Sequence, residues 1–465
     1  MVSNRKSSAD GGRARPRVLV LAEAANPEWV SVPLVGWSFA RAIAREVDAH
    51  LVTQVRNRDA ILRAGLIEGR DFTSIDSERV ARPLNRVGAW VAGLKGKSFS
   101  TITALETLAY YEFERLVWRR FGAEIKAGQW ELVHRVTPTS PVMPSPIAAR
   151  CSRAGVPFVI GPLNGGVPWP RGFEALARED REWLTRVRGM HKWMPAHRST
   201  RAHAAVILVG SRVAHAEIAE KWRSKCVYMP ENGVDAERVH GVAQRTREGA
   251  LHVIFVGRIV PLKGVDLLLE AVAPLVRDGS VTVEIVGDGR QRAALEEWVR
   301  NEKLGSGVTF SGWLSHARAS ERIGAAHMLA LPSVREFGGG VVIESMAAGA
   351  VPIVLDHGGP PELVSPATGI VVPLGTRAEI VANLHTRIAE LASDRERLET
   401  LASRGIARAR EHFTWGSKAA RLRVLYESIL DPDLARPHFP MPIPDETKSP
   451  ETALGTRAHS APPLR

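Results

Sequence analysis

Cysteine is almost absent from this 465-residue sequence, which contains only Cys151 and Cys226. Two cysteines build neither a disulfide framework nor a structural metal site, so a reduced, cytoplasmic setting is expected. Long apolar runs are missing as well, and no uninterrupted run approaches the length that spans a bilayer. Glu23 breaks the apolar stretch near the N-terminus, which indicates a first strand rather than a signal peptide.

Metal-binding patterns are also lacking. No Asp-x-Asp pair stands in a predicted strand-end loop, and the histidines and cysteines form no set with metal-ligand spacing. We therefore expect chemistry that uses neither a metal ion nor a cofactor.

The net charge of +12 is distributed unevenly, because basic residues exceed acidic ones in residues 1–250 while the rest of the chain is close to neutral. A basic half suits anionic lipid, a lipid-linked phosphate or nucleic acid, but an arginine-rich composition without a focused patch explains it equally well. No nucleic-acid recognition motif supports the last of these partners. Residues 78–127 mix bulky apolar and basic residues, which favours core helices and leaves peripheral contact with the inner membrane face as an open alternative.

A chain of 465 residues is longer than a single hydrophobic core usually supports, so two domains are expected. Apolar runs alternate with amphipathic helical segments along the chain. This order predicts an α/β fold with doubly wound sheets. The predicted parts are a disordered segment (1–15), an N-terminal Rossmann-like domain (16–240), a C-terminal Rossmann-like domain (241–412), a final helix (413–430) and a disordered tail (431–465).

The stretch EFGGG is the most informative of the chain. An apolar run that ends at Leu331 is predicted as a buried strand. Glu336 and Phe337 follow, and then three glycines at 338–340. A helix is predicted from 341 to 350, so the glycines place unpaired N–H groups at the positive end of a helix dipole. Such a loop favours a phosphate group.

Two carboxylates flank these glycines. Glu336 precedes them, and Glu344 lies about 6 Å into the predicted helix at 1.5 Å per residue. An acidic side chain beside an anion is unfavourable unless it binds hydroxyl groups, so the pair suggests a sugar at one end of a diphosphate and a ribose at the other. The plainer alternative is a solvated Glu336 and a Glu344 that only complements the helix dipole.

A second turn with cations follows another predicted strand, at 252–256. Gly257 and Arg258 end this strand, and Lys263 precedes a predicted helix. Arginine binds phosphate in bidentate geometry and lysine acts as a point charge, so the pair predicts a phosphate clamp. The spacing fits neither a Walker A loop nor G-x-G-x-x-G, and the alternative is two solvated cations.

Two features of the first half also lie where strands end. His134 stands near the end of a predicted strand at 131–136, where ligands bind open α/β sheets, although a histidine that only packs is equally compatible. The loop GPLNGG, with Asn164 and Gly165, follows a predicted strand at 158–160. Its glycines favour close approach by a ligand, or an ordinary tight turn.

Taken together, these motifs resemble a known family. EFGGGVVIESMAAG, followed by PIV and GGPPE, is similar to the E-x7-E signature of the retaining glycosyltransferases of family 4, which have the GT-B fold. The G-R…K-G turn and the segment MPENGVD are similar to further family segments, and the resemblance covers roughly residues 17–430. It implies two Rossmann-like domains that face an interdomain cleft, with the helix at 413–430 crossing back to the N-terminal domain.

The resemblance also implies an activity and roles for residues. The activity is metal-independent transfer of a hexose-type sugar from a nucleotide-diphosphate sugar to a glycan or lipid-linked acceptor in polysaccharide or glycolipid synthesis, with retention of configuration. The implied sets are catalytic (Glu336, Arg258, Lys263, His134), donor-binding (Gly257, Arg258, Lys263, Gly312, Leu314, Glu336, Phe337, Gly338, Gly339, Gly340, Val341, Glu344) and acceptor-side (Gly36, Asn164, Gly165). The resemblance also implies that the edge with Gly312 and Leu314 lies against the nucleobase. Two alternatives remain open, namely a synthase acting on a soluble sugar or sugar phosphate and a non-catalytic scaffold that binds nucleotide sugars.

Overall fold

The structure is a computed structural model, and it describes residues 15–79, 99–174, 176, 194–238 and 249–440. The predicted disordered ends lie outside these residues, apart from residue 15 and residues 431–440. Much of the bulky, basic stretch, at 80–98, also lies outside them.

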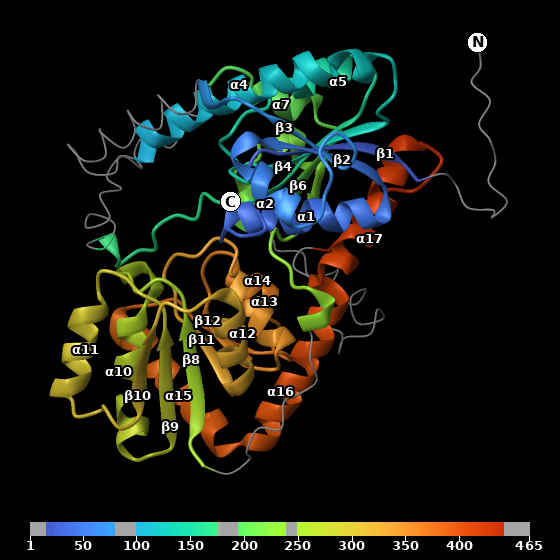
Figure 1. The fold of residues 1–465 in the computed structure, drawn as a ribbon. Coiled ribbons are helices and arrows are strands. Elements are labelled where there is room, and N and C mark those ends of the chain that lie inside the picture. Colours follow the sequence, from blue (N-terminus) through green and yellow to red (C-terminus); the bar gives the residue numbers. More distant parts are fainter. Residues whose placement is uncertain (1–14, 80–98, 175, 177–193, 239–248, 441–465) are drawn as a thin grey trace, which may run out of the picture. The chain divides into compact units, whose positions relative to one another are not determined.

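Two sheets form the framework of the described chain (Figure 1). The strands of the first are β1 (Arg17–Ala22), β2 (Asp48–Gln54), β3 (Phe72–Ile75), β4 (Leu132–Thr137), β5 (Phe158–Leu163), β6 (Val206–Val209) and β7 (Cys226–Tyr228). Those of the second are β8 (Leu251–Val256), β9 (Val281–Val286), β10 (Val308–Gly312), β11 (Met328–Leu331), β12 (Val351–Leu355) and β13 (Ile370–Val372). The strand orders are β3-β2-β1-β4-β5-β6-β7 and β10-β9-β8-β11-β12-β13, and central pairs such as β1–β4 and β8–β11 run parallel. The predicted doubly wound α/β sheets are confirmed.

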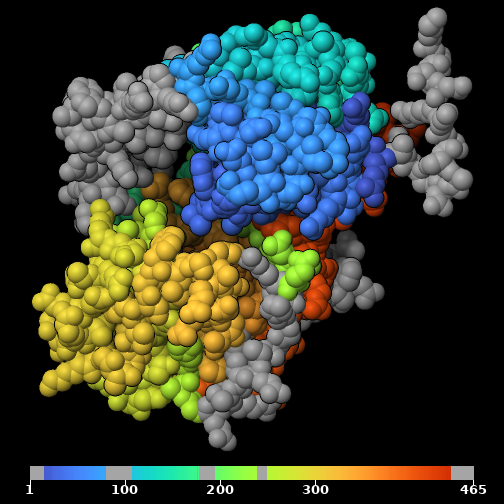
Figure 2. Space-filling model, viewed as in Figure 1, coloured from blue at the N-terminus to red at the C-terminus, as the bar shows by residue number. Residues whose placement is uncertain are grey.

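Helices connect these strands. They are α1 (Val32–Glu46), α2 (Arg58–Arg63), α4 (Phe99–Lys126), α5 (Ile147–Arg153), α7 (His197–His203), α8 (Arg212–Ala216), α9 (Glu220–Arg223), α10 (Val265–Arg277), α11 (Arg292–Asn301), α12 (His316–Ala325), α13 (Gly340–Ala347), α14 (Pro360–Leu363), α15 (Arg377–Ser393), α16 (Arg395–Arg408) and α17 (Trp415–Leu430). Short 3₁₀ turns occur at η1 (Val55–Asn57), η4 (Ala236–Arg238) and η5 (Pro261–Lys263), and a π-helical turn, η6 (Ala409–Phe413), follows α16. The helix α1 lies over one face of the first sheet in Figure 1. The blue atoms in Figure 2 show that the N-terminal part of the chain forms a broad area of the visible surface.

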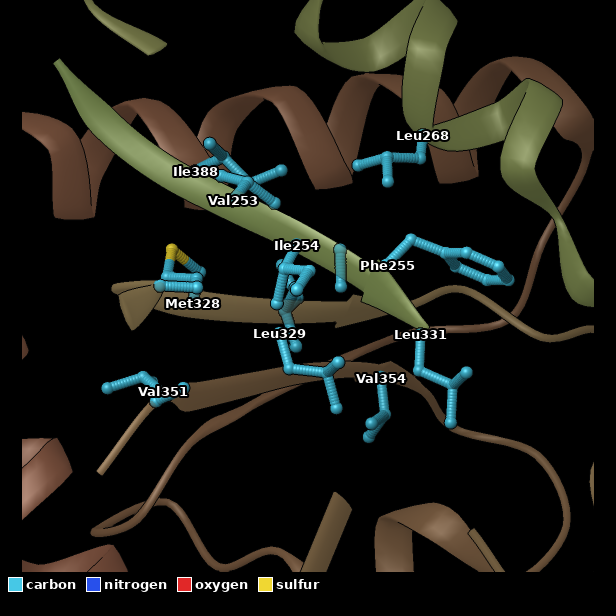
Figure 3. Packing of buried hydrophobic residues seen from close by; sticks show 14 of the residues in the cluster. Val253, Ile254, Phe255, Leu268, Met328, Leu329, Leu331, Val351, Val354 and Ile388 are labelled. Carbon is cyan, nitrogen blue, oxygen red and sulfur yellow. The ribbon is translucent and has the colours of Figure 1, made fainter. Parts of the chain in front are cut away.

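The second sheet is buried on both faces, which explains its continuous apolar strands. Met328 of β11 is in register with Val253 of β8 and Val351 of β12, and all three side chains are fully buried. Figure 3 shows these side chains together with Leu268 of α10 and Ile388 of α15. The strands that lead to the predicted site are therefore packed into a continuous core.

Helix α4 packs into the core from residue 107 onward. Tyr110, Phe113, Val117 and Phe121, spaced three or four residues apart, are all buried. The core interpretation of this stretch is confirmed for its described part. In the described ranges no helix has both the length and the apolar character needed to cross a membrane.

The chain divides into two compact units. Unit 1 comprises the described parts of Met1–Gly161, Gly189–Ile207 and Ala419–Pro437, and unit 2 those of Pro162–Arg188, Leu208–Lys418 and His438–Arg465. The segment that follows β7 belongs to unit 2 because Val234 pairs there with the segment around Thr414. The predicted domain limits at 240 and 412 remain a prediction.

Candidate active site

The loop between β11 and α13 carries the three predicted glycines. Gly339 is the N-cap of α13 and adopts the left-handed region with a φ of 59°. The amide N–H groups of Gly338, Gly339 and Gly340 make no hydrogen bond within the described residues, as expected for the first turn of a helix. The helix stops before the predicted position 350, because Gly349 has a φ of 74°.

The carbonyl groups of the same loop are bonded to the protein. Glu336 O accepts a hydrogen bond from the amide of Gly359 at 3.2 Å. Phe337 O accepts one from Asn164 Nδ2 at 3.0 Å. The Phe337 ring itself is exposed, and Val341 is half-buried against the core.

The predicted clamp residue Lys263 lies against this loop. Lys263 ends η5, and its ammonium group donates a hydrogen bond to the Glu336 carboxylate, with both side chains about 15% exposed (15% and 16%). The amide of Val334 donates to Leu262 O at 3.0 Å and ties the two loops together. The structure therefore brings together Lys263 and Glu336, which the sequence analysis assigned to one site.

Arg258 is placed differently. The amide of Gly257 donates to Val286 O at 3.0 Å, so the start of this turn is held by β9. The Arg258 side chain is exposed, and within the described part of the chain its guanidinium makes no hydrogen bond or ion pair. It shares a turn with Lys263 and is available to an anionic ligand.

Glu344 has a partner that sequence reasoning missed. Its Oε1 lies 3.1 Å from Nε2 of His316, the first residue of α12. The two residues are 28 positions apart, and His316 belongs to none of the recognised motifs. Only its position two residues after Leu314, at the predicted nucleobase edge, pointed toward the site.

The predicted nucleobase edge is partly used by the protein itself. Gly312 has a φ of 69°, and its carbonyl accepts a hydrogen bond from the amide of Gly287 at 2.8 Å. Leu314 is half-buried against the core. Contact of either residue with a nucleobase remains a prediction.

The predicted acceptor-side residue Asn164 is buried and fully bonded. Its Nδ2 donates to Glu231 Oε1 and Oε2 at 2.7 and 2.8 Å and to Phe337 O. Its Oδ1 accepts from the amide of Gly165 at 2.8 Å and from the hydroxyl of Ser211 at 3.0 Å. In this structure Asn164 therefore binds other groups of the protein. Gly165 is half-buried, and its predicted contact with the acceptor remains a prediction.

Glu231 is the second residue of this site that sequence reasoning missed. It stands in the segment MPENGVD and had no predicted role, yet its carboxyl is buried beside the glycine loop. Burial raises the pKa of this carboxyl, and the hydrogen bonds from Asn164 oppose that shift. The charge on Glu336 raises the pKa of Glu231 further.

His134 has a structural role in unit 1. It is fully buried, with Nδ1 accepting from the Tyr426 hydroxyl at 2.6 Å and Nε2 donating to Gly161 O at 2.7 Å. Burial lowers the pKa of His134 to about 4, so the ring is neutral. Because both ring nitrogens are bonded to the protein, the geometry favours the alternative of a histidine that only packs, and a catalytic role for His134 stays a prediction that the proposed mechanism does not use.

Gly36 lies within α1 rather than in the loop before it. A Cβ at this position would collide with the carbonyl oxygen of Ala24, so glycine is needed for the close approach of helix and loop. Its predicted acceptor-side contact remains a prediction. Among the described residues, no group of three or more His, Cys, Asp or Glu side chains is arranged to hold a metal ion.

Comparison with known proteins finds similarity between part of this chain and glycosyltransferases. Residues 242–408, which contain the clamp turn and the glycine loop, match the family described as "Glycosyl transferases group 1". The D-inositol 3-phosphate glycosyltransferase of Nocardia farcinica is 31% identical over 246 residues, which are 51% of this chain and 52% of that protein. The alpha-D-kanosaminyltransferase of Streptomyces kanamyceticus is 30% identical over 179 residues, or 38% of this chain and 45% of that protein. The chain spans about half the length of the curated relatives it matches.

Solved structures extend the likeness to the fold of most of the chain. Anabaena Alr3699/HepE in complex with UDP aligns with a TM-score of 0.56 at 15% identity, over 89% of this chain and 100% of that one. Sucrose-phosphate synthase from Thermosynechococcus elongatus aligns with a TM-score of 0.55 at 18% identity, over 89% of this chain and 99% of that one. The predicted GT-B fold, with two parallel-sheet α/β domains, is confirmed.

Proposed function

We propose that the protein is a retaining glycosyltransferase of family 4 that transfers a hexose-type sugar from a nucleotide-diphosphate sugar to a glycan or lipid-linked acceptor. The observation that carries this proposal is the placement of Lys263 and Glu336 beside the unbonded amides of Gly338, Gly339 and Gly340. A cation, free N–H donors and a carboxylate are the groups that a diphosphate joined to a sugar requires. Alr3699/HepE, which has a similar fold, is known in complex with UDP.

The difficult step in this reaction is departure of the nucleoside diphosphate. Lys263, Arg258 and the amides of the glycine loop stabilise the negative charge that develops on the leaving group. Lys263 and the amides are in place before the reaction, since Lys263 ends a short turn and is bonded to Glu336, and the amides begin a helix. The cations supply the stabilisation that a bound metal ion supplies in other transferases, so we propose a metal-independent reaction.

The two glutamates bind hydroxyl groups at the two ends of the diphosphate. Glu344, in the helix, accepts from the ribose, and Glu336, before the glycines, accepts from the donor sugar near the reacting carbon. A donor phosphate oxygen takes the proton of the acceptor hydroxyl as the new glycosidic bond forms and the bond to the diphosphate breaks. No side chain is assigned as a nucleophile.

A thermal-shift panel of UDP-, GDP- and ADP-sugars tests donor binding. A ligand at 100 times its dissociation constant is expected to add about 2.7 kcal/mol to the free energy of unfolding. The preferred donor is then incubated with acceptors, and the product is analysed for the configuration of the new bond. Absence of stabilisation by all three donors would contradict the proposal, and tight binding without transfer or hydrolysis would favour the scaffold alternative.

The acceptor class has a specific rival. D-inositol 3-phosphate glycosyltransferase and sucrose-phosphate synthase are among the similar proteins, and their names favour a sugar phosphate or soluble sugar acceptor. Sugar transfer measured with extracted lipid and, separately, with soluble sugars and sugar phosphates distinguishes a lipid-linked acceptor from a soluble one. The sequence also leaves open a peripheral contact with the inner membrane face. Sedimentation of the protein together with anionic vesicles tests this contact.

A further inference from the structure

A buried polar cluster lies behind the glycine loop in unit 2. Its centre is Glu231, in the loop after β7, whose side chain is only 8% exposed. The fully buried ammonium group of Lys418 donates to the carbonyls of Pro230 and Asn232 on either side of Glu231. The backbone that carries Glu231 is therefore anchored from the first turn of α17.

Asn164 joins this cluster to the glycine loop, and its amide orientation is fixed. The amide of Gly165 donates to its Oδ1, which identifies the opposite atom as the NH₂ group. The two hydrogens of Nδ2 then go to the Glu231 carboxylate and to Phe337 O. Every polar group of Asn164 is used, so this residue sets the position of the Phe337 carbonyl.

The direction of that carbonyl determines the direction of the next amide. In a trans peptide the C=O of one residue and the N–H of the following residue point in opposite directions in one plane. The bond from Asn164 to Phe337 O therefore turns the N–H of Gly338 away from the cluster. Glu231 also occupies the space beside the Gly338 Cα, because a Cβ there would collide with Glu231 Oε1.

Gly338 lies at the sugar end of the proposed diphosphate site. It is two positions from Glu336 and six from Glu344. Its amide is thus expected to face the β-phosphate, to which the sugar is attached, rather than the α-phosphate.

We propose that Asn164 is a positioning residue, held by Glu231, that aims the Gly338 amide at the β-phosphate of the donor. This inference rests on the proposed function, since it assumes that the glycine loop binds the diphosphate. It assigns Asn164 to the donor side of the reaction, whereas the sequence assigned it to the acceptor side.

The test compares UDP with UMP by calorimetry on the full chain, or the matching GDP or ADP pair if the wild-type protein prefers another base. Asn164→Asp keeps the acceptor for Gly165 but removes the donor to Phe337 O. We expect about tenfold weaker binding of the diphosphate, the value of one lost hydrogen bond, with binding of the monophosphate nearly unchanged. Asn301→Asp, at an exposed position in α11, is the matched control.

A double variant separates positioning from simple stability. In N164D/E231Q, the NH₂ group of the new carboxamide at position 231 can donate to the new carboxylate at position 164. The oxygen of that carboxamide can still accept from Asn232. The buried hydrogen bond between the two positions is therefore restored, with donor and acceptor exchanged. Phe337 O still lacks its donor. The melting temperature is therefore expected to recover while the UDP affinity remains about tenfold low. Glu297→Gln, exposed on α11, controls for the loss of a carboxylate.

The outcomes distinguish this inference from the proposed function. An unchanged UDP-to-UMP ratio in N164D, or an affinity that recovers together with the melting temperature in the double variant, overturns the positioning role alone. If the wild-type protein binds none of the diphosphates, the proposed function fails and the inference fails with it. Should N164D not fold, N164D/E231Q carries the test, because it retains the buried pair and replaces the bond to Phe337 O by a carboxylate oxygen that cannot donate to it.

Discussion

Replacement of Lys263 by methionine is the most direct test of the proposed diphosphate site. Methionine retains the length and the apolar stem of lysine but removes the ammonium group. In the structure that group is bonded to Glu336, and both side chains are largely shielded from solvent. The substitution therefore removes a cation from the phosphates and leaves a carboxylate beside them without its partner.

Both effects weaken binding of the diphosphate. A hydrogen bond to a charged group contributes about 1.5–3 kcal/mol. The repulsion between an unpaired Glu336 and a phosphate charge about 6 Å away adds about 3 kcal/mol at an effective dielectric constant near 20. Solvent and side-chain relaxation reduce the sum, so we expect a loss of about 100- to 1,000-fold in kcat/KM.

The repulsive part can be isolated with a second substitution. Glu336→Gln in the K263M background removes the carboxylate charge, so nucleoside diphosphate affinity should rise by about 30-fold over K263M alone, which is the repulsive part after the same relaxation. The assay is calorimetry with UDP, or with the diphosphate that the wild-type protein prefers, on all four members of the cycle. Turnover is not the readout here, because Glu336 itself is assigned to the donor sugar.

Lys303→Met is the matched control, since Lys303 is exposed on the loop after α11. It should leave binding and turnover unchanged. A folded K263M protein whose diphosphate affinity and kcat/KM stay within twofold of wild type would refute the reasoning. In that case the bond between Lys263 and Glu336 would be a structural ion pair, and the phosphates would bind elsewhere.

Further predictions concern the other groups. Arg258→Ala should weaken diphosphate binding about tenfold, because its exposed guanidinium is free to pair with phosphate, and Arg300→Ala on α11 should have no effect. Glu344→Gln should reduce the preference for UDP over 2′-deoxy-UDP about tenfold, and an unchanged preference would place the ribose elsewhere. A chelator should leave turnover within twofold, and loss of turnover restored by a divalent cation would contradict metal independence. The free energy of unfolding should fall as the pH drops from about 6.5 to about 4, because unfolded chains bind a proton at His134 that the folded protein, with a pKa of about 4, does not. The total loss in free energy of unfolding over this pH range is about 3 kcal/mol. Equilibrium denaturation at several pH values between about 6.5 and about 4 measures it, and His134→Gln should make the free energy of unfolding depend less on pH.

The contact between Lys263 and Glu336 was within reach of sequence reasoning. Each residue follows a continuous apolar run, and such runs are typical of buried parallel strands. Their strands, β8 and β11, are neighbours in the sheet, so the loops after them meet at the same edge. Local patterns plus one topological rule were sufficient for this part of the site.

The roles of His134 and Asn164 were not within reach. The partner of His134 is Tyr426, 292 positions away, and the carbonyl that Asn164 binds is 173 positions away. Sequence periodicity gives the face of an element but not which distant side chain lies opposite. A histidine at a strand end and an asparagine in a glycine turn are therefore predicted to contact a ligand, although in the structure both side chains are hydrogen-bonded to other groups of the protein.

The hydrogen bonding of the glycine loop itself indicates the charge of its ligand. A loop that leads into a helix leaves the first N–H groups of that helix unpaired, while its carbonyl groups are free to bond elsewhere. Here the carbonyls of Glu336 and Phe337 are bonded to Gly359 and Asn164, while the amides of the glycines are not bonded within the described residues. Free donors beside carbonyl groups that are already bonded favour the binding of an anion. The loop is therefore selective for negative charge before any side chain is considered, and Lys263 adds to a preference that the backbone already has.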